Sequence, residues 1–398
     1  MNSLTAIRAA AIVALLAKLA CAALTRGTND LDAFYNFGKF IWENGLLAQY
    51  RAAPEFNHTP ATGWFCALIY GLGRGIGFTL LLRVPGIIAD FAVVRALIRW
   101  RGESDEPPSW ALILLALSPV SLMVSGFHGN VDGVLVWLLV LAACECSRGR
   151  AVWSGLWFGL ACNVKIIPLL VAPVFFFHWF ARRNSLRFFL TASLTILAGW
   201  SYPLLAMPET FLRQVLGYSS NWGGWGITWW LSQTSAAAFA TVGFSGLSPT
   251  QLAIMSTLKM VIVAAALFLA WQRRALDAGQ VFYTIALVWT VFFVFAPGVG
   301  AQYLVWFAPF LLIHSPRWFA AITAASSVFL FVFYDTICGG LPWYHGASTA
   351  ELVPRWAGWS NLPWLALVAF LAVSVSRVLA ARAYSSSSSG SSSSGGRS

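Results

Sequence analysis

Two carboxylates one residue apart, in Asp30-Leu-Asp32, are the densest acidic feature of a chain that has only 14 acidic side chains. They come shortly after an apolar segment, residues 5–24. One of them can cap the helix that follows, because Asp is favoured at the N-cap and in the first turn. The other can act as a general base, or the pair can bind a divalent cation such as Mg²⁺ or Mn²⁺. Asp30 and Asp32 are therefore the candidate catalytic residues and metal ligands.

A second polar cluster separates two apolar segments at SGFHGNVDG, where His128, Asn130 and Asp132 lie close together. Polar groups between two apolar spans must be satisfied internally or face water. The cluster is therefore either a helix-end cap or one wall of a substrate site, and the sequence supports both readings equally. All three residues are candidate substrate contacts.

Four more polar side chains are candidate substrate contacts. His58 lies in FNHTP, Lys165 in ACNVKIIP, and Gln302 and Tyr303 in GVGAQYLVW. A lysine at the centre of a membrane helix costs roughly 2.5–3.5 kcal/mol, and less near the interface. Lys165 either extends its ammonium group to the surface or serves as the partner of a phosphate.

Tryptophans crowd the uncharged stretch NWGGWGITWW. Trp favours the headgroup level of a bilayer, so an aromatic belt explains most of the 21 tryptophans of the chain. Four of them beside three glycines also suit stacking on sugar rings, because glycine permits close approach. Trp222 and Trp225 are the candidate sugar contacts.

The composition places these residues in a membrane protein. Hydrophobic residues make up 59% of the chain and charged residues only 10%, which cannot supply a water-soluble exterior. We expect an all-α polytopic bundle of about 12 transmembrane helices. The expected spans lie near residues 5–24, 81–99, 109–125, 131–147, 151–164, 165–181, 188–206, 251–271, 280–296, 301–315, 318–335 and 362–381. The first of these we interpret as a retained helix rather than a cleaved signal.

The basic residues predict the orientation. Lys and Arg clusters follow alternate spans, and all fall on one face if both termini are cytoplasmic. The net charge of +11 is thus mainly a topology signal, and no continuous basic face indicates a nucleic-acid partner. Long loops, 25–80, 207–250 and 336–361, then lie on the outer side.

The first outer loop predicts two helices at the membrane interface, Asp32–Asn44, which Gly45 ends, and Pro60–Leu72. Residues 1–384 form one transmembrane domain, and the Ser/Gly-rich tail 385–398 should be disordered. The six cysteines show neither a disulfide framework nor a metal-binding spacing. Arg83 and Asp90 share a span and can pair along one helix face.

Several segments in order carry a resemblance to a known family. They are NDLDAFYNFGKFIWENG, FNHTPATGWF, LLRVPGIIAD, SPVSLMVSGFHGNVDG, NVKIIPLL and QYLVWFAP. Over residues 5–335 the chain resembles the GT-C superfamily of integral-membrane glycosyltransferases, and within it the bacterial and glycosylphosphatidylinositol-pathway mannosyltransferases. Thr59 stands where that family often has proline.

The resemblance implies a mannosyltransferase-like enzyme of a bacterial inner (plasma) membrane. It implies inverting transfer of a hexose, mannose favoured, on the outer face of the membrane. The donor would be a sugar on a polyprenyl phosphate, and the acceptor a glycan, a lipid or a protein. An acidic residue of the first loop would be the base or lie near a metal. A phosphate leaving group needs positive charge or hydrogen-bond donors aimed at it, and Lys165, Arg26 or Arg51 can supply them.

A secondary transporter or a flippase of lipid-linked sugars is the alternative. Twelve spans with Asp90, Lys165 and Lys259 inside them are compatible with it. Transporters, however, tend to have two similar halves and a site at the midplane, whereas the polar residues here concentrate on one face. A cavity open on one side only would favour the enzyme.

Overall fold

A computed structural model describes residues 3–102, 107–217 and 221–390, and most of these lie in helices. Within these ranges seven helices are long and apolar enough to cross a bilayer. They are α1 (Ser3–Leu24), α5 (Ile76–Arg101), the broken helix α6–α7–η1 (Ser109–Ala116, Pro119–Ser121, Leu122–His128), α11 (Ser185–Ala206), α14 (Pro249–Gln272), α17 (Pro316–Cys338) and the run η5–α18–η6–α19 (Ala350–Leu352, Val353–Trp356, Ala357–Ser360, Asn361–Gly390).

The remaining expected spans correspond to shorter helices. They are α8 (Asp132–Ser147), α9 (Ala151–Val164), η2 with α10 (Ile167–Val171, Ala172–Ala181), α15 (Gln280–Phe295), and η4 with α16 (Ala301–Val305, Ala308–His314). An all-α membrane fold is thus confirmed. A count of twelve spans is not, because these shorter helices do not reach the length that a membrane span requires. Helix α19 continues through residues 385–390 of the expected disordered tail, and 391–398 lie outside the described residues.

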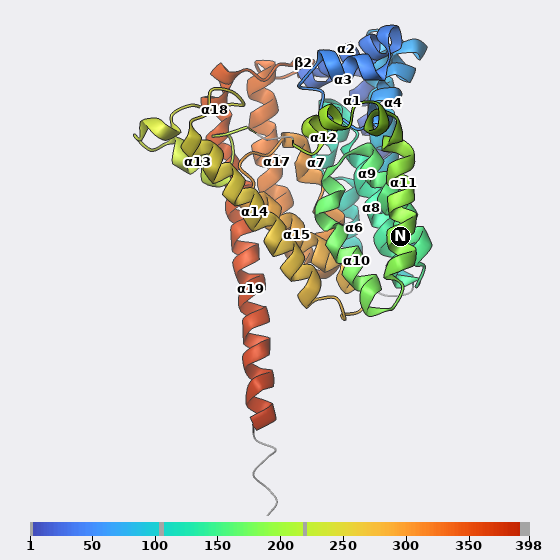
Figure 1. Cartoon of the computed structure of the whole chain (residues 1–398), viewed down its shortest axis with the longest axis vertical. Helices are drawn as coiled ribbons and strands as arrows, with labels where there is room; N and C mark the ends of the chain where they lie inside the picture. Colours follow the sequence, from blue (N-terminus) through green and yellow to red (C-terminus); the bar gives the residue numbers. More distant parts are fainter. Residues whose placement is uncertain (1–2, 103–106, 218–220, 391–398) are drawn as a thin grey trace, which may run out of the picture.

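The loops and turns that connect these helices lie at two ends of the bundle. Figure 1 shows α2 (Asn29–Asn44), α3 (Leu46–Ala52), α12 (Pro208–Val215) and the strand β2 (His345–Gly346) gathered at one end, while α19 extends away from it. At the other end, Arg182 of the α10–α11 turn donates to the carbonyl of Leu276 in the α14–α15 turn at 2.9 Å. Two of the basic turns therefore lie side by side, as the charge pattern predicts.

The first loop forms the helices that the sequence predicts. Gly45, at φ +85°, ends α2 and separates it from α3, and α4 (Pro60–Leu72) packs against α2. Strand β1 (Gly27–Thr28) pairs in parallel with β2, with Gly27 opposite His345. This two-residue ladder fastens the third long loop to the first. The second long loop carries the small helices α13 (Gly226–Ser232) and η3 (Ala237–Phe239).

Arg83 is the organising residue beneath the first loop. Its side chain is fully buried, and its guanidinium donates to the carbonyls of Ala22 and Thr25 at the end of α1, and of Gly126 and Phe127 in η1. Carbonyls released by a helix end and by an irregular helix need such donors when they are buried. Arg83 therefore joins the segments that precede Asp30 and His128.

The expected pairing of Arg83 with Asp90 is wrong. Asp90 instead accepts hydrogen bonds from Lys18 of α1 at 2.7 Å and from Ser121 of α7 at 2.6 Å. Residues seven apart do share a helix face, but the neighbouring helices offer each side chain a better-placed partner. These two hydrogen bonds connect α5 to α1 and to α7.

Candidate active site

A cavity of about 840 Å³ lies under the gathered loops. Its walls come from α2, the loop before α4, the turn 128–130, the start of η2, α14, the segment 292–306, α17 and the third long loop. Most of this lining is apolar, with a few polar side chains converging on it, which is the usual character of a small-molecule site. Segments far apart in sequence therefore build one chamber.

Asp30 supplies the carboxylate of this cavity. It lies in the first turn of α2, and its Oδ2 is 3.0 Å from His128 Nε2. The other imidazole nitrogen, Nδ1, is buried without a hydrogen-bond partner. The tautomer with its proton on Nε2 satisfies both observations, since it aims a donor at Asp30 and leaves only a lone pair on Nδ1.

The surroundings of Asp30 keep it ionised. Burial acts to raise the pKa of this carboxyl, but the hydrogen bond from the His128 imidazole and the charge of Lys165 outweigh it and lower the pKa below its ordinary value. The side chain still has 41% of its surface accessible. An ionised, accessible carboxylate can accept a proton from a substrate hydroxyl.

Asp32 has different surroundings. Its Oδ1 accepts from Arg26 Nη2 at 2.7 Å, and its Oδ2 lies 2.9 Å from His345 Nε2. It does not line the cavity. Asp32 therefore reinforces the β1–β2 contact between two loops, and the two acids that the sequence groups together occupy separate environments. Neither is the N-cap of α2, because that position belongs to Thr28.

Lys165 lies in the cavity wall, and Asp132 and Tyr303 hold its ammonium group. Its Nζ donates to Asp132 Oδ1 at 3.1 Å and lies 4.6 Å from the ring centroid of Tyr303. Asp132 is buried behind the wall and also accepts from Trp306 Nε1 at 2.9 Å. Tyr303 stacks on Trp306 with centroids 4.0 Å apart. This arrangement fixes the ammonium group at the cavity surface.

The other predicted polar residues also lie at the cavity. His58, Asn130 and Gln302 line it, and the amide oxygen of Asn130 also accepts a hydrogen bond from the backbone N–H of Val131 at 2.7 Å. Burial and then the charge of Lys165 lower the pKa of His58 to about 3. His58 is therefore a neutral imidazole.

Trp222 and Trp225 do not line the cavity. Both indoles are buried, and Trp225 Nε1 donates to the carbonyl of Phe293 at 2.6 Å while Trp222 stacks on Phe239. Their glycine neighbours bend the chain, with Gly223 at φ +87° and Gly226 at φ +48°. This placement favours packing of the second loop over contact with a sugar.

The sequence model of glycosyltransferase family 87 matches residues 87–297, more than half of the chain. The chain belongs to glycosyltransferase family 87. It is a membrane glycosyltransferase of the GT-C type, as the resemblance implies. No curated protein matches the chain.

The family 87 chain does not offer a divalent cation a suitable site among its described residues. They include no group of three or more His, Cys, Asp or Glu side chains placed to hold a metal ion. Both carboxylates of the predicted pair face basic groups, Asp30 facing His128 and Asp32 facing Arg26. That arrangement suits ion pairs better than metal ligation.

Some cavity residues of this glycosyltransferase were not candidates from sequence. Glu55, Asn57 and Asn221 come from outer loops, and Lys259 comes from the middle of α14. The loop residues could not have been selected, because they show no periodic pattern. Lys259 could have been selected, because a lysine within a span of some twenty apolar residues is expected to be functional.

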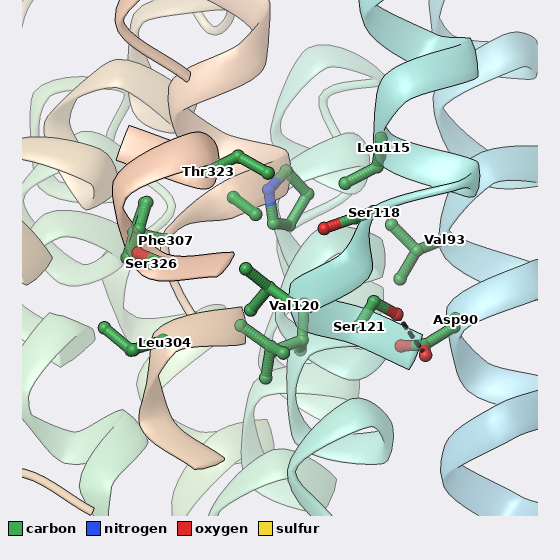
Figure 2. A pocket seen from close by; sticks show the side chains of 14 residues that line it. Asp90, Val93, Leu115, Ser118, Val120, Ser121, Leu304, Phe307, Thr323 and Ser326 are labelled. Atoms are coloured by element: carbon green, nitrogen blue, oxygen red, sulfur yellow. Dashed lines mark hydrogen bonds between the residues drawn. The ribbon is translucent and has the colours of Figure 1, made fainter. Parts of the chain in front are cut away.

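A second, small cavity of about 40 Å³ lies deeper in the glycosyltransferase. Figure 2 shows Asp90, Ser118, Ser121, Thr323 and Ser326 around it, beside the break between α6 and α7. In transporters such a broken helix with a carboxylate can bind a cation. Here the Lys18 ammonium already occupies the position beside Asp90.

Proposed function

We propose that this glycosyltransferase moves a hexose, mannose favoured, from a polyprenyl phosphate to an acceptor hydroxyl on the outer face of the membrane. The observation that carries the proposal is the placement of Asp30 and Lys165 on one cavity, inside a helical bundle whose exterior is apolar. A carboxylate and a cation are the two groups that an inverting transfer requires, one for each side of the sugar.

Asp30 is the proposed base. It takes the proton of the acceptor hydroxyl as that oxygen forms a bond to the anomeric carbon. The bond between this carbon and the phosphate oxygen breaks, and its electron pair leaves with the polyprenyl phosphate. Attack from the face opposite the leaving group inverts the configuration. His128 orients the carboxylate through the 3.0 Å contact.

Lys165 is the proposed partner of the leaving phosphate. Charge builds up on the phosphate oxygens as the glycosidic bond breaks, and a preorganised cation stabilises that charge more than it stabilises the bound donor. Asp132 and Trp306 fix the position of the ammonium group in advance. The acceptor can be a glycan, a lipid or a protein, because each offers a hydroxyl group.

A lipid-linked donor is supported by the lining of the cavity. Phe244, Phe329 and Phe333 are among its apolar side chains, which suit an isoprenoid chain better than a free nucleotide sugar. With the basic turns cytoplasmic, the cavity faces outward in the inner membrane of a bacterium, where no nucleotide sugar is available.

The test compares Asp30→Asn with Asp32→Asn in purified enzyme supplied with a panel of polyprenyl-phosphate sugars. We expect Asp30→Asn to lower the transfer rate by about 10²–10⁴-fold, the usual contribution of a general base. Asp32→Asn should retain measurable transfer, because Asp32 lies outside the cavity. Normal transfer by Asp30→Asn, with the protein folded and inserted, would contradict the proposal.

A further inference from the structure

A basic cavity of about 320 Å³ lies between α1 and α5, apart from the site described above. Three arginines line it, Arg8 of α1 and Arg95 and Arg99 of α5. The other lining side chains are apolar, and they include Ile12 and Phe91. None of these residues lines the large cavity, so the proposed transfer leaves this second site without a task.

The basic cavity lies at the end of the bundle opposite the long loops. Helix α1 ends and helix α5 begins at the first long loop, so the start of α1 and the end of α5 lie far from it. Arg8 follows Ser3, the first residue of α1, and Arg95 precedes Arg101, the last residue of α5, each by less than about 10 Å at 1.5 Å per residue. Side chains at that depth can extend their charged groups to the headgroup level of a bilayer.

The helical spacing separates the charged part of the cavity from its apolar part. Arg95 and Arg99 are one turn apart on the same face of α5, and Phe91 lies one turn further from the helix end. On α1, Ile12 lies one turn deeper than Arg8 in the same way. The guanidinium groups therefore surround the outer part of the cavity, and the apolar side chains lie toward the centre of the bilayer.

The apolar part of the cavity is open to the surroundings of the bundle. Ile12 is 50% exposed, and Ile88, which precedes Phe91 by about one turn, is 52% exposed. In a membrane protein such side chains face the acyl chains of lipids. A molecule in the cavity can therefore have one part between the arginines and another part in the bilayer.

The protein does not supply a counter-charge for these arginines. Among the residues that the structure describes, no carboxylate forms a salt bridge with Arg8, Arg95 or Arg99. Like charges that share one cavity repel each other, and a bound anion would remove that repulsion. The charge pattern that orients a membrane protein requires arginines near the helix ends, but it does not require three of them around one cavity.

We propose that the cavity between α1 and α5 binds an anionic phospholipid of the leaflet at this end of the bundle. Its phosphate lies among Arg8, Arg95 and Arg99, because guanidinium groups match phosphate oxygens with paired hydrogen bonds. Its acyl chain lies along Ile12 and Phe91, a surface that a free phosphate would leave uncovered. Basic pockets between membrane helices bind lipid headgroups in this manner.

A lipid at this position would stabilise the packing of α1 against α5. The two helices are already joined by the ion pair of Lys18 with Asp90 at 2.7 Å. A ligand that binds only the folded protein raises its stability in proportion to occupancy and affinity. The lipid site does not depend on the proposed transfer, so each can be tested without the other.

The experiment measures the melting temperature of purified enzyme in neutral detergent as phosphatidylglycerol, phosphatidylcholine or glycerol phosphate is added. We expect phosphatidylglycerol to raise it saturably and the other two to raise it less, because phosphatidylcholine has no net charge and glycerol phosphate has no acyl chains. Arg8→Gln and Arg95→Gln should each weaken the apparent affinity for phosphatidylglycerol about fivefold, the scale of one basic residue at a membrane surface. Arg95→Lys should keep the preference for phosphatidylglycerol.

Arg187→Gln is the matched control. It removes the same charge from an exposed position near the start of α11, outside this cavity, and should retain wild-type affinity. Wild-type affinity in Arg8→Gln and Arg95→Gln would overturn the proposal, as would an equal loss in Arg187→Gln, which would indicate a general surface-charge effect. An equal response of the wild type to phosphatidylcholine or to glycerol phosphate would overturn it too. If one of the two variants does not fold, the other decides, because they lie on different helices.

Discussion

At the scale of single residues, this site depends on which partner each ionisable group has. Asp30 and Asp32 are chemically identical and two positions apart, yet Asp30 contacts His128 at the cavity and Asp32 joins Arg26 and His345 between loops. Their different partners give them different tasks. The neutral state of His58 follows in the same way from burial beside Lys165.

His58 yields a prediction about acid sensitivity. Its pKa is about 3 in the folded protein, against an ordinary value of 6.5. Between these values the unfolded chain binds a proton that the folded protein does not, so stability falls as pH drops below about 6.5. The expected loss is about 1.4 kcal/mol of unfolding free energy per pH unit.

Melting temperature measured between pH 6.5 and 4.5 checks this prediction. The decline should be clearly shallower in His58→Gln than in the wild type, because glutamine does not titrate. Parallel curves for wild type and His58→Gln would contradict the buried neutral state.

At the scale of secondary-structure elements, two interrupted helices carry three of the predicted residues that line the cavity: His128, Gln302 and Tyr303. Pro119 ends α6 because the residue before a proline avoids the helical conformation, and Ser118 has ψ 121°. The π-helix η1 then leads to His128, and η4 carries Gln302 and Tyr303. Irregular helices of this kind are concentrated at functional sites.

The small cavity beside the break between α6 and α7 gives a prediction about the sign of a change in melting temperature. Ser326 Oγ of α17 lines this cavity and is buried without a protein partner. A cavity of about 40 Å³ has room for water. We expect an ordered water to bond Ser326, so Ser326→Ala should lower the melting temperature, because the water loses a partner.

A dry cavity would give the opposite result. Removing an unsatisfied buried hydroxyl, which costs about 1–3 kcal/mol, would then raise the melting temperature. Ser327→Ala is the neighbouring control, since the hydroxyl of Ser327 already donates to the carbonyl of Thr323 at 2.7 Å.

At the scale of the whole molecule, the long loops gather at one end and basic turns at the other (Figure 1). Residues of all three long loops line the cavity, which is the arrangement that the enzyme interpretation expects, whereas a transporter site lies at the midplane between two similar halves. The enzyme interpretation requires these loops to face the outer side of the bilayer and the basic turns to face the cytoplasm.

Cysteine labelling tests that direction. In intact cells a membrane-impermeant maleimide should label Asn36→Cys, an exposed position of α2. Asp277→Cys, exposed in the α14–α15 turn, should react only after permeabilisation. The wild-type chain is the background control, because its six cysteines are buried or half-buried. The reverse pattern would place Asp30 on the cytoplasmic side and remove the lipid-linked outer-face reaction.

The sequence by itself determined that a bilayer surrounds the protein, which segments form helices, and which polar residues are candidates for the site. Apolar length and the near absence of charge require a bilayer, glycine and proline end or interrupt the helices locally, and seven of the predicted site residues do line the cavity: Asp30, His58, His128, Asn130, Lys165, Gln302 and Tyr303. These properties follow from composition and from neighbours along the chain.

Only the tertiary structure decided which of these groups meet. Asp30 and His128 are 98 positions apart, Lys18 and Asp90 are 72 apart, and Asp32 and His345 are 313 apart. Local patterns carry no information about such pairs, so Arg83 and Asp90 looked like partners and Trp222 looked available to a sugar. The buried groups take the partners that helix packing brings within hydrogen-bond distance, because an unpaired charge inside the bundle is too costly.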